Sequence, residues 1–403
     1  MVFTAKPFIQ GKFTVITGPV GSDKVALVAS FLDHLVDSGY RNDHNVGVFR
    51  HPADDLNPEF IGRHQVQVTD NLDSIFQSIT PQTRTVFLVG AAHYTSPDIV
   101  GLADAVVRSN RDLIVAGLNL DSRGKPYGYM PNLITLADEI ILAKAICSYP
   151  GCRSIEANRS KGQELNFEAF CAHHYTNECP PIPKELAGSL KLYLGPMFSG
   201  KSTRWSRELN KVKKVGWDPI VLNYSRDVRD GNTDRENSGK GYITLHNGSQ
   251  LEAVLVRDGS EVKNYLTSHP NQKVVFINEA QFMAGLYQTI FDLIPQGYQF
   301  HVDGLSRGFN RGKFGDIADL VCLADTVDMS YATCVVCGDP ATENQRMKRV
   351  NGTVMPAHYD DPLEAVGGKD TGKAEFFYEA RCLKDWILIG EPSLKYSLPK
   401  FNW

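Results

Sequence analysis

The stretch from Leu194 to Thr203 reads LGPMFSGKST and decides the fold expected for this chain. It contains the spacing G-x-x-x-x-G-K-S, follows a strand-like apolar run, and precedes a helical pattern through Trp205, Leu209 and Val212. A strand, a glycine-rich loop and a helix in this order predict a phosphate-binding loop, in which backbone N–H groups and the helix N-terminus cradle an anion. We therefore expect a nucleoside triphosphate site; the alternative is a glycine-rich turn with a chance Lys-Ser.

Two side chains of this loop have expected roles in chemistry. Lys201 should reach the β- and γ-phosphates of ATP, and the Ser202 hydroxyl should ligate Mg²⁺. The loop residues predicted to bind ATP and Mg²⁺ are Gly195, Pro196, Met197, Phe198, Ser199, Gly200, Lys201, Ser202 and Thr203.

Size and composition set outer limits. The 403 residues allow two or three domains, and a net charge of −4 gives no indication of nucleic-acid binding. No apolar run reaches transmembrane length, and the first residues lack a signal-peptide pattern. The eight cysteines lie mostly in close pairs joined by histidines, which favours zinc over disulfides in an intracellular chain. We expect a soluble cytoplasmic protein without a nucleic-acid or membrane partner.

The first half of the chain repeats the second. A strand at Phe13–Thr17 leads into GPVGSDKV at Gly18–Val25 and then into an apolar helix to about Val36. Further matching pairs are TVFLVGAAHY (85–94) with KVVFINEAQF (273–282), VAGLNLDSRGKPYG (115–128) with VDGLSRGFNRGKFG (302–315), and LAD at 136–138 and 323–325. Matching segments in the same order predict a tandem duplication. The Pro-rich segment 179–188 is the expected linker between domains at 1–178 and 189–403.

Strand and helix patterns alternate within each half. This alternation predicts an α/β fold with a mainly parallel sheet, of the P-loop NTPase (RecA-like) kind, present twice. The polar segment Asp227–Gly241 has almost no apolar content and is expected to be a mobile loop, either merely solvated or a lid.

An apolar strand at Val274–Ile277 ends in Asn278-Glu279-Ala280-Gln281-Phe282. Ligands of open α/β sheets bind at the C-terminal ends of the strands, so Glu279 is placed to meet them. We assign it as the general base that accepts the proton of an attacking hydroxyl. The alternative is a surface glutamate at a strand end.

Together these motifs resemble the zinc-containing type II thymidine kinases. The resemblance rests on GPMFSGKST, the EAQF strand end, G-L-x-x-x-F-x-x-x-x-F-G at 304–315, CVVCGDPATENQR at 334–346 and YEARC at 378–382. It extends in order over residues 188 to 390 and implies phosphorylation of the thymidine 5′-hydroxyl by ATP, a step of nucleotide salvage that supplies DNA synthesis.

The resemblance also implies roles for individual residues. Glu279 matches the catalytic base, and Asn278 and Gln281 join the ATP- and Mg²⁺-binding set. The residues matched to the nucleoside pocket are Met197, Phe282, Leu305, Phe309, Phe314, Asn344 and Tyr378. The segment between the cysteine pairs corresponds to a lasso whose backbone binds the thymine.

Two positions depart from the family pattern. Asn278 stands where the family has an Asp that helps hold Mg²⁺; it keeps a carbonyl oxygen but loses the charge, so weaker Mg²⁺ binding is expected. Asn344 stands where relatives have Thr, which leaves the choice of base open.

The cysteine pairs predict two structural zinc sites. In the second half Cys334 and Cys337 pair with Cys382 and Asp385, with His358 as an alternative fourth ligand. In the first half the predicted ligands are Cys147, Cys152, Cys171 and His174, with His173 as the alternative to His174. Reduced cysteines without metal are the other reading, and Cys179 and Cys322 belong to neither set.

The first half lacks the residues that the chemistry needs. Asp23 replaces the second loop glycine and puts a carboxylate where phosphate should lie, and Val25 replaces the Mg²⁺-binding Ser. Aligning Tyr94 with Phe282 puts Ala91 opposite Glu279 and Gly90 opposite Asn278. We predict a pseudokinase domain.

Three functions remain in view: a thymidine kinase with a catalytic C-terminal half, a non-catalytic nucleotide-binding scaffold, and a kinase of another deoxynucleoside. The intact Lys201, Ser202 and Glu279 favour a kinase over a scaffold. Family members are commonly tetramers, so two tandem chains are expected to pair as a homodimer that forms a pseudo-tetramer.

Overall fold

A computed structural model describes residues 11–37, 45–54, 65–152, 154–163, 166–176, 187–225, 240–244, 250–363 and 375–401. The chain divides into two compact units, one made of Met1–Cys171 with Pro392–Trp403 and the other of Ala172–Glu391. The last twelve residues therefore belong with the first unit, although the sequence assigned them to the second domain. Of the predicted mobile loop Asp227–Gly241, residues 227–239 lie outside the described residues, whereas Lys240 and Gly241 belong to a strand. Cys179 also lies outside the described residues.

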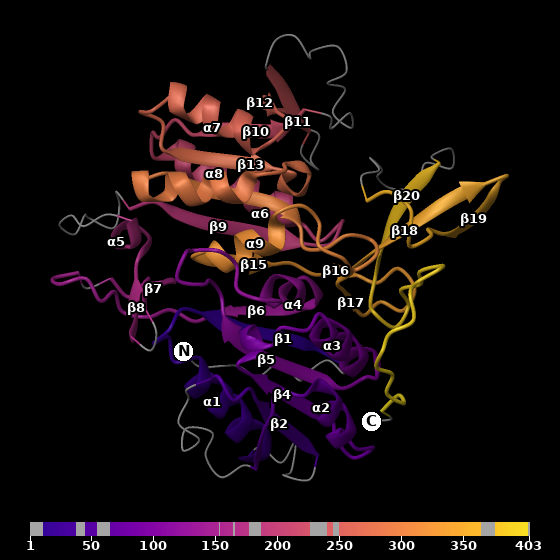
Figure 1. The fold of residues 1–403 in the computed structure, drawn as a ribbon. Helices are drawn as coiled ribbons and strands as arrows, with labels where there is room; N and C mark the ends of the chain where they lie inside the picture. The colour runs from indigo at the N-terminus through magenta and orange to yellow at the C-terminus, as the bar shows by residue number, and fades with distance from the viewer. Residues whose placement is uncertain are drawn as a thin grey trace. The chain divides into compact units, whose positions relative to one another are not determined.

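The first unit is built on a parallel sheet (Figure 1). Its elements are β1 (Phe13–Gly18), α1 (Lys24–Asp37), β2 (Val46–Arg50), β3 (Val66–Val68), α2 (Leu72–Ser78), β4 (Thr85–Val89), η2 (Ala91–His93), α3 (Asp98–Arg108), β5 (Asp112–Leu118), α4 (Met130–Leu136), β6 (Glu139–Leu142) and the hairpin β7 (Arg159–Gln163) and β8 (Asn166–Phe170). Among the described residues the strand order is β3-β2-β4-β5-β1-β6. The apolar side of α1 packs on this sheet, because Val28 and Leu32 share a buried cluster with Ile16 and Phe87.

The second unit repeats this plan and adds to it. Its sheet elements are α5 (Ala172–Thr176), β9 (Ser189–Gly195), α6 (Lys201–Lys214), β10 (Ile220–Tyr224), β11 (Lys240–Thr244), β12 (Gln250–Val256), α7 (Gly259–Ser268), β13 (Val274–Asn278), η6 (Ala280–Phe282), α8 (Leu286–Leu293), η7 (Ile294–Gln296), β14 (Gln299–Leu305), α9 (Ile317–Leu323) and β15 (Thr326–Met329). In the described chain the order is β11-β12-β10-β13-β14-β9-β15, with only β11 antiparallel to its neighbour. The predicted α/β class with a parallel sheet is confirmed.

A smaller antiparallel region follows the second sheet. It contains β16 (Ala332–Thr333), β17 (Pro340–Ala341), β18 (Glu343–Val350), β19 (Thr353–Pro356) and β20 (Phe376–Arg381). Strand β18 lies between β19 and β20, and β16 pairs with β17. This region carries the second cysteine group, together with described residues of the segment that the resemblance matches to the lasso.

The two sheets match in register as well as in strand order. The central strands β1 and β9 each lie between a parallel neighbour from later in the same unit and an edge strand. The last residue of the central strand is a glycine in both, and it faces Leu118 in the first unit and Leu305 in the second. Tandem duplication, predicted from four short segments, is confirmed across whole sheets.

One pair of glycines shows how closely the halves correspond. Gly128 and Gly315 both have left-handed backbones, with φ of 55° and 54°. A Cβ at Gly128 would lie 2.4 Å from the Ala92 carbonyl oxygen, and one at Gly315 would lie 2.2 Å from the Gln281 carbonyl oxygen. Only glycine permits this backbone approach, so the same constraint acts at equivalent places in both halves.

Among the described residues, no helix is long and apolar enough to cross a bilayer.

Candidate active site

The predicted phosphate loop joins β9 to α6. Gly200 has a left-handed backbone (φ 78°) directly before the first helical residue, Lys201. Lys201 is 7% exposed, and in the described part of the chain its ammonium group makes no hydrogen bond or ion pair. An unpaired cation at the N-terminus of a fourteen-residue helix suits an anionic ligand, because the free N–H groups and the helix dipole act in the same direction.

Three buried serine hydroxyls surround the end of β9. The backbone N–H of Ser306 donates to the Gly195 carbonyl (3.4 Å), and that of Ser330 donates to Leu194 (2.8 Å). Within the described residues the hydroxyls of Ser199, Ser306 and Ser330 are buried without a hydrogen-bond partner. Buried polar groups are normally satisfied, so these hydroxyls fit a site that receives a polar ligand.

Glu279 follows the last residue of β13 in a left-handed conformation (φ 56°, ψ 41°). Its Oε2 accepts a hydrogen bond from the Gln281 amide, and Oε1 of that amide accepts one from the backbone of Leu305 (3.1 Å). Through Ser306, the residue after Leu305, the contacts continue to Gly195. The side chain of Gln281 thus ties the predicted base to the strand beside the phosphate loop.

The residues near the end of β13 can accommodate a cation. Asn278 Nδ2 donates to Asn223 Oδ1 (2.9 Å), and both side chains are buried. The side-chain oxygen of Asn278, Oδ1, therefore accepts no hydrogen bond among the described residues. A neutral oxygen here and the Ser202 hydroxyl fit Mg²⁺ that is held mainly by phosphate oxygens and water.

The predicted nucleoside-pocket residues fall into two aromatic groups. Phe282 stacks on Tyr224 (ring centroids 5.1 Å apart) and meets Phe314 edge-on at 5.2 Å. In the other group, Phe309 and Tyr378 share a buried cluster, and the remaining members are Ala357, Met197, Leu363 and Leu388. Leu305, the last residue of β14, is 8% exposed.

The sequence did not single out Tyr224 or Arg346. Tyr224 ends β10, so its place at a strand end was the available signal. The guanidinium of Arg346 lies 3.9 Å from the centre of the Phe309 ring, and its Nε donates to the Tyr378 hydroxyl at 2.8 Å. It also donates to the carbonyls of Pro362 and Leu363. Arg346 is two residues beyond Asn344 on the same strand, a spacing that puts both side chains on one face.

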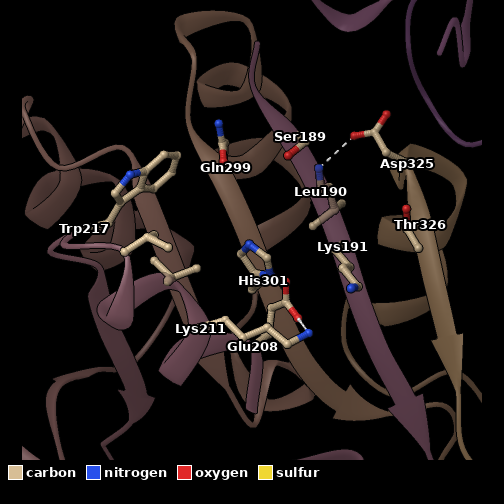
Figure 2. Close-up of a pocket in the computed structure, with 12 residues that line it drawn as sticks. Ser189, Leu190, Lys191, Glu208, Lys211, Trp217, Gln299, His301, Asp325 and Thr326 are labelled. Atoms are coloured by element: carbon tan, nitrogen blue, oxygen red, sulfur yellow. Dashed lines mark hydrogen bonds and ion pairs between the residues drawn. The ribbon is translucent and has the colours of Figure 1, made fainter. Parts of the chain in front are cut away.

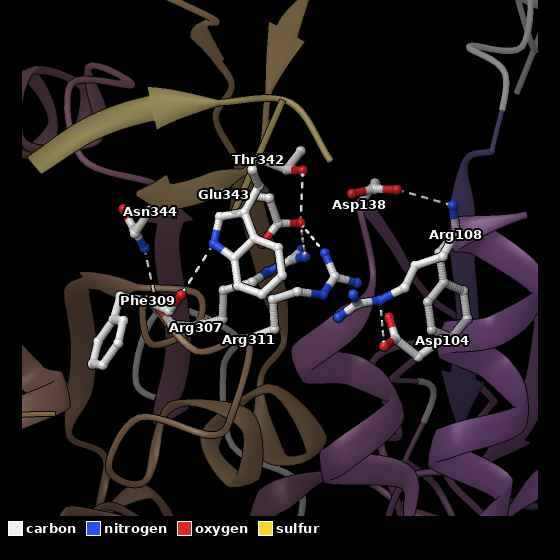
Figure 3. A network of polar contacts seen from close by, with 11 residues as sticks. Asp104, Arg108, Asp138, Arg307, Phe309, Arg311, Thr342, Glu343 and Asn344 are labelled. Atoms are coloured by element: carbon white, nitrogen blue, oxygen red, sulfur yellow. Dashed lines mark hydrogen bonds and ion pairs between the residues drawn. The ribbon is translucent and has the colours of Figure 1, made fainter. Parts of the chain in front are cut away.

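Four consecutive polar residues of β18, Glu343 to Arg346, are each only 1% exposed. Figure 3 shows that Glu343 meets the guanidinium groups of Arg307 and Arg311, with Arg307 Nη1 2.8 Å from Glu343 Oε1. The Asn344 amide accepts from the Met197 backbone (2.8 Å) and donates to the Arg307 carbonyl (2.9 Å). Asn344, assigned to the base pocket from the family pattern, therefore connects β18 to the phosphate loop through its amide oxygen and to the loop after β14 through its amide nitrogen.

The structure gathers both predicted sets of zinc ligands. One ligand atom from each of Cys334, Cys337, Cys382 and Asp385 lies within 4.8 Å of the others. Asp385 Oδ2 accepts from the thiols of Cys334 and Cys382, each at 3.2 Å. His358, the alternative ligand, is absent from this group; its Nδ1 accepts from the backbone of Asp360 instead. Three sulfurs and one carboxylate oxygen are a donor set that zinc accepts.

The equivalent group of the first half is Cys147, Cys152, Cys171 and His174, whose ligand atoms lie within the same 4.8 Å limit. His173, the alternative to His174, is absent from this group. Cys322 lies elsewhere, buried in α9, where burial raises the pKa of its thiol.

In the degenerate phosphate loop of the first half, the lysine side chain is bonded to the loop itself. Lys24 Nζ donates to the Pro19 carbonyl and, at 3.1 Å, to the Ser22 hydroxyl. Burial lowers the pKa of Lys24 to about 8, although the carboxylates of Asp54 and Asp23 oppose this shift. The Lys24 amine is therefore bonded to its own loop, in the space where a phosphate would bind. The Lys201 amine has no such partner among the described residues.

The alignment of the strand ends was wrong by one residue. β4 ends at Val89 and β13 at Asn278, so Gly90 stands opposite Glu279, and both have left-handed backbones. A Cβ at Gly90 would lie 2.7 Å from Asp54 Oδ2. The first half therefore has no side chain at the position of the base, and the Asp54 side chain takes that space.

A cavity of about 410 Å³ lies at the opposite end of the second sheet (Figure 2). Its lining includes the first residues of β9 and β14 together with Glu208, Trp217 and His301. The phosphate loop follows the last residue of β9, so this cavity is separate from the candidate active site.

Comparisons with known proteins agree with this geometry. The family model described as "TK: Thymidine kinase" matches residues 32–180 and again residues 188–386. A thymidine kinase of Halobacterium salinarum is 32% identical over 198 residues, which cover 49% of this chain and 92% of that protein. A thymidine kinase of Coprothermobacter proteolyticus is 35% identical over 196 residues, covering 48% of this chain and 88% of that protein. Nearly a whole relative thus corresponds to half of this chain.

Proposed function

Because this chain belongs to the thymidine kinase family and contains its fold twice, we propose that the C-terminal half transfers the γ-phosphoryl group of ATP to the 5′-hydroxyl of thymidine. The observation that carries this proposal joins two features of the second sheet: Lys201 at the start of α6, whose ammonium group has no partner among the described residues, and the Glu279 carboxylate, held at a strand end. The named relatives support the choice of thymidine as acceptor.

The chemistry follows from positions and charges. Lys201 and the backbone N–H groups of the loop bind the phosphates and offset the negative charge that develops during transfer. Glu279 accepts the proton of the attacking hydroxyl, and Gln281 keeps its carboxylate turned toward the end of β14. Ser202 and Asn278 would hold Mg²⁺, which would supply further charge neutralisation on the phosphates. The aromatic groups around Phe282 and Phe309 bind the base and exclude water.

We propose that the N-terminal half does not catalyse this reaction. Lys24 is bonded within its own loop, Gly90 has no side chain to act as a base, and Val25 replaces the hydroxyl of Ser202. Each difference removes a separate requirement of phosphoryl transfer.

A matched pair of variants in the full-length protein tests both proposals. Lys201→Met should lower phosphoryl transfer to thymidine by about 10³-fold or more, because the phosphate charge loses its main partner, whereas Lys24→Met should stay within about 2-fold. Glu279→Gln should lower turnover by about 10²-fold or more while ATP binding persists. Transfer should be measured with each deoxynucleoside in turn. Near-normal turnover in Glu279→Gln, or a large loss in Lys24→Met, would reject the assignment of the site to the second half.

We also propose that two chains associate as a homodimer, so that four kinase folds carry two working sites. Closed two-fold dimers are the commonest assembly, and the linker already gives each half one neighbour at high effective concentration. Light scattering should report a mass near twice 44.7 kDa. A mass of one chain at micromolar concentration would contradict the dimer.

A further inference from the structure

The last described residues, 392–401, have no regular secondary structure and form part of the first unit. They also lie beyond residue 386, where the match to the family model ends. In Figure 1 the yellow C-terminal end lies beside α2 and α3 of that unit. An irregular segment stays in place only where side chains and backbone bonds hold it, and here two anchors do so.

The first anchor is Tyr396, which is 2% exposed in a segment whose other residues are mostly exposed. Its ring packs against Phe76 with centroids 5.1 Å apart, and its hydroxyl donates to Asp73 Oδ1 at 2.8 Å. The neighbouring Lys395 ammonium lies 2.7 Å from Asp98 and 3.3 Å from Asp73. These contacts join the segment to α2 and to the N-terminus of α3.

The second anchor is Phe401. Its backbone N–H donates to the Ser109 carbonyl at 2.7 Å, and its carbonyl accepts from the Asn110 side chain at 3.2 Å. The guanidinium groups of Arg84 and Arg111 lie 5.2 and 5.5 Å from the centre of its ring. Such cation–π contacts stabilise an aromatic ring on a basic surface.

Arg111 shows that the first unit is adapted to this segment. It is 1% exposed, burial lowers its pKa, and its Nη1 donates to the Pro399 carbonyl at 2.9 Å. A buried guanidinium is costly unless its donors are paired. Removing the segment would take away a carbonyl acceptor and expose the charge beside Thr83 and Thr80, whose carbonyls bind its other nitrogens.

We infer that residues 392–401 are a docking segment, and that the N-terminal half binds it in the same chain. The degenerate half thus acts as the receptor for the end of the catalytic half. The required chemistry is a Lys-Tyr pair followed by a Phe five residues later, received by two carboxylates, one aromatic ring and two arginines.

Docking also restrains Ile389, which is bonded to the lasso through its backbone. Seven residues before Tyr396, the Ile389 carbonyl accepts from Tyr359 at 2.8 Å, and its N–H donates to Ala357 at 3.3 Å. Ala357 belongs to the buried cluster of Phe309 and Tyr378. Fixing one end of so short a connection limits the motion of the other end. The consequence for nucleoside binding rests on the proposed function, whereas the docking itself does not.

Hydrogen exchange of the full-length protein, followed by mass spectrometry, tests the docking without any assay of activity. Tyr396→Ala should speed exchange in peptides covering 392–401 and 105–111 by about 100-fold, because the buried ring and its hydroxyl bond are lost together. Tyr396→Phe should speed it by about 10-fold, since only the bond to Asp73 is removed. Lys400→Ala is the matched control: Lys400 is exposed and makes no hydrogen bond or ion pair among the described residues, so exchange should not change.

Equal exchange in the wild type and in Tyr396→Ala would overturn the proposal. Protection that disappears when the wild-type protein is diluted would also overturn it, because the segment would then occupy a second chain. With docking established, the KM for thymidine in Tyr396→Ala should rise several-fold while kcat stays within about 2-fold. An unchanged KM alongside fast exchange would reject only the restraint on the lasso.

Discussion

At Glu279 the backbone is left-handed, a conformation that costs a non-glycine residue about 1 kcal/mol. The equivalent residue of the first half is Gly90, which adopts the same conformation without that cost. We therefore expect Glu279→Gly to be more stable than Glu279→Ala by about 1 kcal/mol, with both variants inactive. Urea unfolding of the two variants measures the difference.

Arg207, exposed in the middle of α6, provides the opposite case. In a right-handed helix, Arg207→Gly should be less stable than Arg207→Ala by about 1 kcal/mol. If glycine were the less stable variant at position 279 as well, the left-handed backbone there would carry no strain.

At the residue scale the sequence identified candidate residues more readily than it identified their contacts. Lys201, Ser202 and Glu279 could be recognised because their spacing follows a strand, a loop and a helix. The contacts of Asn344 could not, because a polar residue in a strand gives no sign of whether its amide faces ligand or backbone. The alignment error of one residue at Gly90 has a similar origin, since the sequence does not show which residue adopts the left-handed backbone conformation.

Among the elements, β18 differs most from what its sequence suggests. Polar residues at successive positions predict an exposed edge, yet Glu343 to Arg346 are buried by partners from the loop after β14, from the lasso and from Ile387. Such tertiary burial has no local signal. By contrast, the strands β1, β9 and β13 were predicted correctly, because buried parallel strands are continuous apolar runs.

Breaking the charge cluster on β18 should be costly. Glu343→Gln leaves the buried guanidinium groups of Arg307 and Arg311 without a carboxylate, which should lower the free energy of unfolding by about 3 to 5 kcal/mol. Glu379→Gln is the control on the neighbouring strand, because its ion pair with Arg381 is partly exposed and should contribute at most about 1 kcal/mol. Denaturant unfolding of the two variants measures both losses of unfolding free energy. A loss in Glu343→Gln as small as that in Glu379→Gln would contradict a stabilising buried charge cluster.

β14 should give the protein a pH-dependent stability. Burial, aided by Lys191 and opposed by Glu208, lowers the pKa of His301 to about 4, and its ring stacks on Phe276 at 4.4 Å. Between pH 6.5 and 4 the unfolded chain binds this proton and the folded chain does not, so stability falls as the pH falls. From pH 7 to pH 5 the wild type should lose about 2 kcal/mol more than His301→Gln.

Asn264→Ala is the control for this titration, since Asn264 is exposed on α7 and has no titratable side chain. That variant should keep the full pH dependence of the wild type in urea unfolding. Parallel stability curves for the wild type and His301→Gln would exclude His301 as the source.

For the whole molecule, duplication was predictable because equivalent segments recur in the same order. The division of the chain was not, since residues 392–401 pack on the first unit through Tyr396 and Phe401 rather than through a repeated motif. The two halves nevertheless differ in which candidate functional groups they contain. Among the described residues, both contain a group of four side chains that could hold a metal ion, whereas the unpaired lysine and the carboxylate at the strand end occur only in the second.

This difference predicts unequal numbers of bound zinc and nucleotide. Thiolate groups hold a metal through local geometry alone, so each half should keep its zinc, and metal analysis of protein prepared without chelators should give about two ions per chain. ATP needs an open loop and a free lysine, so calorimetric titration should give about one site per chain, lost in Lys201→Met and retained in Lys24→Met. In Asp385→Ala the zinc content should fall to about one, whereas in His358→Ala it should stay at two. Two nucleotide sites per chain would mean that Lys24 leaves its loop when ATP binds, and the first half could no longer be regarded as a receptor alone.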